Sequence, residues 1–193
     1  STCQRKGGII WHTQGSGKSL VMVLLAKWIL ENNPHARVAI VTDRDELDKQ
    51  IERVFTDVGE PITRTSSGRD LMSQLGRATP RLLCSLLHKF GRKDVDDFDA
   101  FIKELEAQPS RTVGEVFVFV HECHRTQSGK LHRVMKALMP NAVFIGFTGT
   151  PLLKNDAQTS FEVFGDYIHT YKFSEGVEDG VVLDLVYEAR DID

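Results

Sequence analysis

Short runs of apolar residues alternate along the chain with longer stretches in which apolar residues recur at helical spacing. The continuous apolar runs predict buried strands, and they lie at residues 7–11, 37–41, 81–87, 116–120 and 142–147. The helical stretches lie at residues 17–32, 45–58, 67–75 and 131–139. In the second of these, apolar residues including Ile51 and Phe55 share one face and charged residues the other, which is typical of an amphipathic helix.

Strands that are apolar throughout, rather than at every second position, indicate a parallel sheet covered by helices on both faces. We therefore expect one α/β domain with a mostly parallel sheet of about six or seven strands. The charged segment 91–112, which contains Pro109, predicts a solvated connection with some helix. Among single side chains, Trp28 and the pair Phe117 and Phe119 are expected in the core.

The composition is that of an ordinary globular domain, with 193 residues, 41% of them hydrophobic and 26% charged, which excludes a disordered, collagen-like or coiled-coil chain. The net charge of -3 excludes a strongly basic nucleic-acid-binding protein but not a local basic face. No apolar run approaches the roughly 18 residues of a membrane span. The three scattered cysteines, Cys3, Cys84 and Cys123, favour reduced thiols in a cytoplasmic protein. Because the chain begins at Ser1 and stops abruptly at Asp193, we expect a piece of a longer protein.

A glycine-rich segment, residues 12–19 (HTQGSGKS), joins the first predicted strand directly to the first predicted helix. This strand–loop–helix context is the one that a phosphate-binding loop requires. Gly15 and Gly17 allow successive backbone N–H groups to turn inward around phosphate oxygens, and the helix N-terminus adds its dipole. The predicted phosphate-binding residues are Gly15, Ser16, Gly17, Lys18 and Ser19.

In such a loop Lys18 bridges the β- and γ-phosphates of a triphosphate, and the Ser19 hydroxyl is a ligand of Mg²⁺. The strict pattern has a glycine at its first position, where this chain has His12, which we interpret as a residue that fills the loop. The spacing nevertheless predicts a triphosphate and Mg²⁺ as ligands of this loop.

A second chemical motif, His121-Glu122-Cys123-His124, follows the strand predicted at residues 116–120. A phosphate-binding loop needs a second strand that ends in carboxylates, one beside Mg²⁺ and one that orients the attacking water. Glu122 fits the role of the water-activating base, whereas the magnesium-side position, normally aspartate, is His121. A zinc site is disfavoured because alternate residues of an extended segment point to opposite faces. A nucleophilic Cys123 beside His124 is also disfavoured, since a cysteine after a buried strand more often packs.

Together with Thr148-Gly149-Thr150-Pro151 after the next strand, these motifs resemble the first RecA-like motor domain of superfamily 2 helicases. More closely, the chain resembles the restriction (R) subunit of type I restriction–modification enzymes. The segments that carry this resemblance are WHTQGSGKS, VTDRDELDKQ, HECHR followed by Thr126 and Gln127, FTGTPLLK, and FGDYIHTYKFSEGVEDGVVL.

The resemblance implies a three-layer RecA-like P-loop NTPase fold and one ATP-binding motor lobe over residues 1–193. It implies that ATP hydrolysis drives translocation of double-stranded DNA before cleavage, in a bacterial or archaeal cytoplasm. It further implies methyltransferase and specificity subunits as partners. A nuclease domain and the adenine-contacting segment are expected upstream, and a second RecA-like lobe downstream.

By the same resemblance, Lys18 and Glu122 are the catalytic residues, Ser19 and more weakly His121 lie at the magnesium site, and a short threonine-rich motif couples the nucleotide to DNA. The coupling residues are Thr148, Gly149 and Thr150, and the candidates for contact with DNA are Arg44, Ser85, His88 and Lys89.

Of the departures from the family pattern, only His121 puts the chemistry in question. Its presence leaves open an alternative, a nucleotide-binding module whose hydrolysis is reduced or lost. A P-loop kinase is disfavoured, because the TGTP and HECHR motifs fit motors and no lid-type arginine cluster is evident. We also expect the phosphate-binding loop and the HECH motif at the carboxyl ends of adjacent strands, where one magnesium–triphosphate group reaches both.

Overall fold

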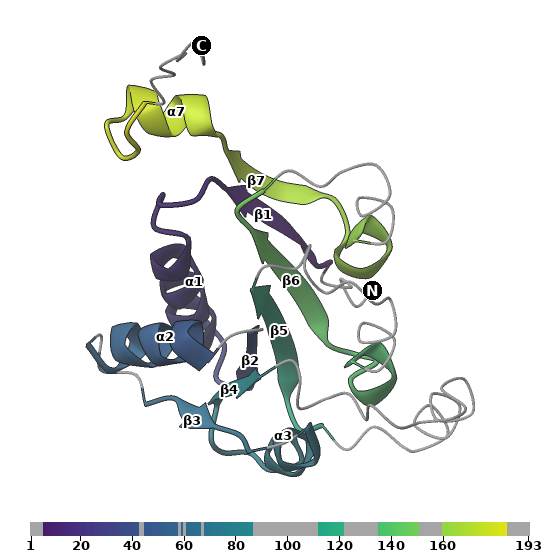
Figure 1. The fold of residues 1–193 in the computed structure, drawn as a ribbon. Helices are drawn as coiled ribbons and strands as arrows, with labels where there is room; N and C mark the ends of the chain where they lie inside the picture. Colours follow the sequence, from purple (N-terminus) through teal and green to yellow (C-terminus); the bar gives the residue numbers. More distant parts are fainter. Residues whose placement is uncertain are drawn as a thin grey trace, which may run out of the picture.

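The computed structural model describes residues 6–42, 45–57, 59, 61–66, 68–86, 112–121, 135–150 and 160–184. Within them lies one seven-stranded sheet of order β3-β4-β2-β5-β6-β1-β7, in which every paired strand runs parallel (Figure 1). The strands are β1 (Gly8–His12), β2 (Ala36–Thr42), β3 (Thr63–Arg64), β4 (Leu82–Leu86), β5 (Glu115–His121), β6 (Val143–Thr148) and β7 (Tyr167–Tyr171). The five strands predicted from apolar runs are confirmed, whereas β3 and β7 were not foreseen.

The helices are α1 (Lys18–Asn32), α2 (Asp45–Asp57), α3 (Gly68–Leu75) and α7 (Phe173–Glu178), with further helical residues at 135–138 and 160–164. Three of the predicted helices, at 17–32, 45–58 and 67–75, are confirmed as α1, α2 and α3. Of the helix predicted at 131–139, the described part is helical at 135–138. The predicted connection at 91–112 lies, except for its last residue, outside the described residues.

Two separate apolar cores lie on the two faces of the sheet, which makes the domain a three-layer sandwich. Side chains of α1 and α2 pack on one face and side chains of α3 and of residues 135–139 and 164 on the other. Each central strand contributes alternately to both cores: in β2, Ile40 joins the first and Val41 the second. This two-sided burial is why the strands are apolar at every position.

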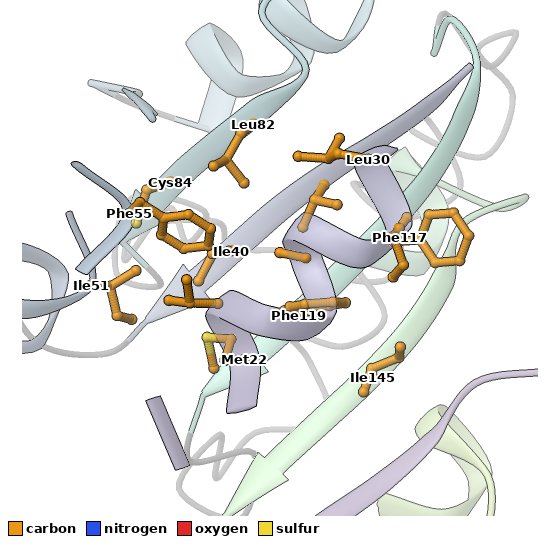
Figure 2. Packing of buried hydrophobic residues seen from close by; sticks show 14 of the residues in the cluster. Met22, Leu30, Ile40, Ile51, Phe55, Leu82, Cys84, Phe117, Phe119 and Ile145 are labelled. Carbon is orange, nitrogen blue, oxygen red and sulfur yellow. The ribbon is translucent and has the colours of Figure 1, made fainter. Parts of the chain in front are cut away.

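The first core is centred on the contact of α1 and α2 with the middle of the sheet. Figure 2 shows Met22 of α1 and Phe55 of α2 with Phe119 of the sheet between the layers. The ring of Phe119 is tilted against that of Phe147, with centroids 5.4 Å apart and planes inclined by 54°. Phe117 and Phe119 are 6% and 0% exposed, so the prediction that they belong to the core is confirmed.

The prediction for Trp28 is wrong. Its side chain is 61% exposed, and Leu24 and Leu20, one and two turns earlier on the same face of α1, are 53% and 50% exposed. Helix α1 is apolar on almost every side, so its sequence indicates a fully buried helix. The sheet covers only one face of it, however, and the face with Trp28 is turned to solvent.

No helix in the part of the chain that the structure describes is long and apolar enough to cross a membrane.

Candidate nucleotide-binding site

Buried polar side chains gather at the carboxyl edge of the sheet. Because all strands are parallel, their carboxyl ends meet at this one edge, where ligands bind in open α/β sheets. Each of these side chains lies at or next to the last residue of one of five neighbouring strands, and each residue is at most 8% exposed. They are Ser85 of β4, Thr42 of β2, His121 of β5, Thr148 of β6 and His12 of β1. Burial of polar groups is costly, so their concentration here marks this edge as the candidate site.

The phosphate-binding loop leaves β1 after His12 and enters α1 at Lys18. Gly15 and Gly17 have φ angles of 84° and 79°, in the left-handed region that costs other residues about 1–2 kcal/mol. Among the residues that the structure describes, none lies within 4 Å of a Cβ atom built on either glycine. The glycines are therefore required by the backbone conformation, and the space above the loop is open to a ligand.

The beginning of α1 is a positive site. Lys18 is only 8% exposed, the first turn carries no acidic residue, and no side chain caps the helix among the described residues. The carbonyl oxygen of Gly17 accepts hydrogen bonds from the N–H groups of Leu20 and Val21, at 2.9 and 3.1 Å, so the first turn of α1 begins at the loop. A buried ammonium group and a helix N-terminus together favour an anion such as a phosphate group.

The loop is braced internally and against its own strand. The Ser16 hydroxyl donates a hydrogen bond to the carbonyl oxygen of Thr13 at 2.5 Å. His12 is the last residue of β1 and buried, with its ring bonded to His169 of β7, so it does more than fill the loop. Burial, and after it the neighbouring His169 and Lys18, lower the pKa of His12 below its ordinary value of 6.5.

The threonine-rich motif lies beside the loop. Thr148, fully buried at the end of β6, is in register with Trp11 of β1. Its Oγ1 donates to the carbonyl oxygen of Thr150 at 2.9 Å and accepts from the Thr150 N–H at 3.2 Å. This hydroxyl closes a tight turn over Gly149, directly next to the strand that feeds the phosphate-binding loop.

The expectation that the phosphate-binding loop and the HECH motif follow adjacent strands is wrong, because β6 lies between β1 and β5. His121 ends β5, is 5% exposed and is in register with Phe147 of β6. Two strand spacings separate the ends of β1 and β5 by about 10 Å. Thr148 at the end of β6 therefore lies between the ends of β1 and β5, at the same edge of the sheet.

Several predicted site residues lie outside the described residues, namely Arg44, His88, Lys89 and Glu122. Ser85, a predicted DNA contact, is described and is only 1% exposed. Its hydroxyl makes no hydrogen bond within the described part of the chain, and neither does that of Thr42 in the neighbouring strand. In this structure the Ser85 hydroxyl is therefore inside the sheet edge and not on the surface.

Residues of β7 contact the loop and were missed by the sequence analysis. His169 binds His12, and the Tyr171 carbonyl oxygen accepts a hydrogen bond from the Thr13 N–H at 2.9 Å. The signal that could have found them is the segment Tyr167-Ile168-His169-Thr170-Tyr171, since aromatic and β-branched residues favour a strand.

Comparison with known proteins shows the family to which the chain belongs. The family model described as SWI2/SNF2 ATPase matches residues 1–193. The chain is 34% identical over 188 residues to a Methanocaldococcus jannaschii protein named for a type I restriction enzyme endonuclease subunit, MjaIXP, covering 96% of this chain and 17% of that protein. It is 33% identical to the type I restriction enzyme HindI endonuclease subunit of Haemophilus influenzae, covering 97% of this chain and 19% of that protein. The resemblance to restriction subunits seen in the sequence is thus confirmed, and the chain spans less than a fifth of these relatives.

Solved structures show the same fold at lower identity. The Pyrococcus furiosus Hef helicase domain matches with a TM-score of 0.58 and 15% identity, over 89% of this chain and 36% of that one. A Sulfolobus solfataricus SWI2/SNF2 ATPase core, solved in complex with double-stranded DNA, matches with a TM-score of 0.53 and 16% identity, over 78% and 29% of the two chains. The predicted three-layer RecA-like P-loop fold with a parallel sheet is confirmed.

Proposed function

Because the chain belongs to the SWI2/SNF2 ATPase family, we propose that it is the ATP-hydrolysing motor lobe of a type I restriction enzyme endonuclease subunit. In this role it couples ATP hydrolysis to translocation of double-stranded DNA before cleavage. The observation that carries the proposal is the buried Lys18 at the start of α1, behind two glycines held at positive φ. A largely buried lysine beside this loop fits a polyphosphate.

In the proposed reaction the loop holds the triphosphate and Glu122 removes a proton from the attacking water. Lys18 contributes charge that offsets the negative charge developing on the phosphate oxygens. The Ser19 hydroxyl is the loop residue that would hold Mg²⁺, and the open, acid-free start of α1 fits a magnesium–triphosphate group. When bound, Mg²⁺ supplies further neutralisation of the phosphate charge.

The turn closed by Thr148 is the proposed coupling element. It lies between the ends of β1 and β5, so a change at the phosphates reaches it on one side and a change at the HECH motif on the other. The proposed contacts with DNA are Arg44, after β2, and His88 and Lys89, after β4. Since β2 and β4 are neighbours, these basic residues follow adjacent strands and are suited to one phosphate backbone.

We also propose how the longer protein is arranged outside residues 1–193. A nuclease domain and the adenine contacts precede this lobe in the proposed arrangement, and a second RecA-like lobe follows it. Methyltransferase and specificity subunits complete the proposed complex. The proposal of a nuclease domain is supported by the names of the relatives, which are endonuclease subunits, and the proposal of further domains by the less than one fifth of their length that this chain spans.

The test is Lys18→Ala in the intact protein, with Lys27→Ala as a matched control on the same helix. Lys27 is partly exposed and pairs with Glu31 at 3.9 Å. Removal of one preorganised charge from a phosphoryl-transfer site lowers turnover by roughly 10²–10³-fold. We expect DNA-stimulated ATP hydrolysis to fall by that order in Lys18→Ala and to be unchanged in Lys27→Ala. Equal rates in the two variants would refute the proposed site.

His121 favours one second candidate, a nucleotide-binding module with reduced hydrolysis. A neutral imidazole offers one acceptor nitrogen and no charge where an aspartate would supply both charge and acceptors. The variant His121→Asp, assayed for DNA-dependent ATPase across a Mg²⁺ titration, distinguishes the two functions. A rise of roughly 10- to 150-fold, or a lower Mg²⁺ requirement, supports the reduced module. Unchanged activity and Mg²⁺ requirement show that His121 is a working substitute.

A further inference from the structure

The phosphate-binding loop is held from outside its own strand–helix unit, by the edge strand β7. Figure 1 shows β7 beside β1 and continuing into α7. The two strands are paired in parallel, with Ile10, Trp11 and His12 in register with His169, Thr170 and Tyr171. The β1 strand is thus bordered by β6 on one side and β7 on the other, up to the residue where the loop begins.

Two histidine side chains are in contact across the two strands. His12 Nε2 and His169 Nδ1 are 2.8 Å apart, and the ring centroids are 5.0 Å apart with planes inclined by 59°. In a neutral pair one ring nitrogen donates and the other accepts, so the bond fixes the tautomer and orientation of both rings. His12 is 8% exposed, whereas His169 lies on the exposed side of the sheet edge.

A second set of contacts holds the first residue of the loop. The Thr13 N–H donates a hydrogen bond to the Tyr171 carbonyl oxygen at 2.9 Å, while the Thr13 carbonyl oxygen accepts one from the Ser16 hydroxyl at 2.5 Å. Helix α7 closes over the same residue: a Cβ atom built on Gly176 would lie 3.5 Å from Thr13 Cγ2. The Tyr171 hydroxyl in turn donates to Asp179 at 2.6 Å, which ties α7 to β7.

We infer that His12 and His169 are positioning residues for the phosphates, acting through the loop and not on the reacting atoms. This inference rests on the proposed function. The loop contains two glycines, which lose more conformational freedom on ordering than any other residue. Fixing the direction in which the chain enters the loop lowers that entropic cost of nucleotide binding. His12 occupies the position where the family pattern has a glycine, and its side chain anchors the loop to β7.

A double-mutant cycle tests the pair in the intact protein. His12→Ala, His169→Ala and the double variant are compared for Mg²⁺–ATP binding and for KM and kcat of DNA-stimulated hydrolysis. One neutral hydrogen bond corresponds to roughly 2- to 10-fold in affinity. We expect each single variant to raise KM by that factor, the double variant to raise it no further, and kcat to stay within about twofold. His35→Ala, at an exposed histidine before β2, is the matched control and leaves both parameters unchanged.

A rescue variant separates positioning from a general need for folding. Gln at position 12 places an amide nitrogen near the site of Nε2, and Asn at position 169 places an amide group near the site of Nδ1. The combination His12→Gln with His169→Asn is therefore expected to restore KM to within about threefold of wild type. Because it keeps the polar contact, it reads out the pair even if His12→Ala fails to fold.

The results of these experiments distinguish failure of the positioning role from failure of the proposed function. Additive effects of the two alanine variants, no effect on KM, or no rescue by the amide pair would overturn the positioning role, whereas the proposed function would still stand if Lys18→Ala lowers DNA-stimulated hydrolysis. A wild-type protein that binds no Mg²⁺–ATP overturns the proposed function, and the positioning role with it.

Discussion

Replacing Arg37 with methionine should be the most destabilising single change at a polar residue of the described chain. Arg37 belongs to β2 and is 1% exposed, and its guanidinium donates to four backbone carbonyl oxygens. The acceptors are those of Gln74 at 2.9 Å, Leu75 at 2.7 Å, Arg77, and Pro80 at 2.6 Å. The first two lie in the last turn of α3, whose carbonyls have no partner within the helix.

The magnitude follows from two opposing terms. The carbonyl oxygens of Gln74 and Leu75 also accept hydrogen bonds from the N–H groups of Arg77 and Val113, at 3.1 and 2.9 Å, so each keeps one donor. A carbonyl that stays buried with no donor costs about 1–3 kcal/mol, although water that enters the site reduces that cost. In the other direction, methionine removes the unfavourable burial of a charge, which already lowers the pKa of Arg37, and it retains the apolar stem. We therefore expect the free energy of unfolding to fall by about 2–4 kcal/mol.

The assay is urea denaturation, with Arg64→Met as the control. Arg64 pairs with Glu52 at 3.0 Å, and their side chains are 38% and 48% exposed. Surface pairs of this kind contribute about 0–1 kcal/mol. A lower midpoint at unchanged denaturant dependence would show a loss of stability in the native state. If Arg37→Met costs no more than Arg64→Met, the four hydrogen bonds do not stabilise the fold as argued.

Two further predictions follow from exposure and from protonation. Trp28→Ser should change the free energy of unfolding by less than about 1 kcal/mol, whereas Phe119→Ala should lower it by about 3–5 kcal/mol. If denaturant titrations give similar losses for the two variants, the exposed face of α1 is contradicted. Because burial lowers the pKa of His12, its contribution to stability is complete above pH 6.5 and is lost as the pH falls through the lowered value. The unfolding free energy of His12→Gln, measured at pH 5.5 and 7.5, should therefore fall less on acidification than that of the wild type, and an equal fall would contradict the assignment.

The local elements and the chemistry of the loop could be predicted from the sequence. Apolar runs that fill both faces of a strand mark a sheet between two helical layers, and the glycines at 15 and 17 followed by Lys18 mark a phosphate-binding loop. These patterns depend on neighbours along the chain, so local spacing is enough to recognise them.

The tertiary structure decided what depends on distant neighbours. Which face of α1 is covered, and hence that Trp28 is exposed, depends on how much of an apolar helix the sheet can reach. That β6 separates the two chemical motifs depends on the crossovers between strands, and no apolar pattern encodes their order. His12 and His169 are 157 positions apart and meet only because β7 pairs with β1. A side-chain contact of this kind has no local signature, since neither histidine alone differs from one that simply packs.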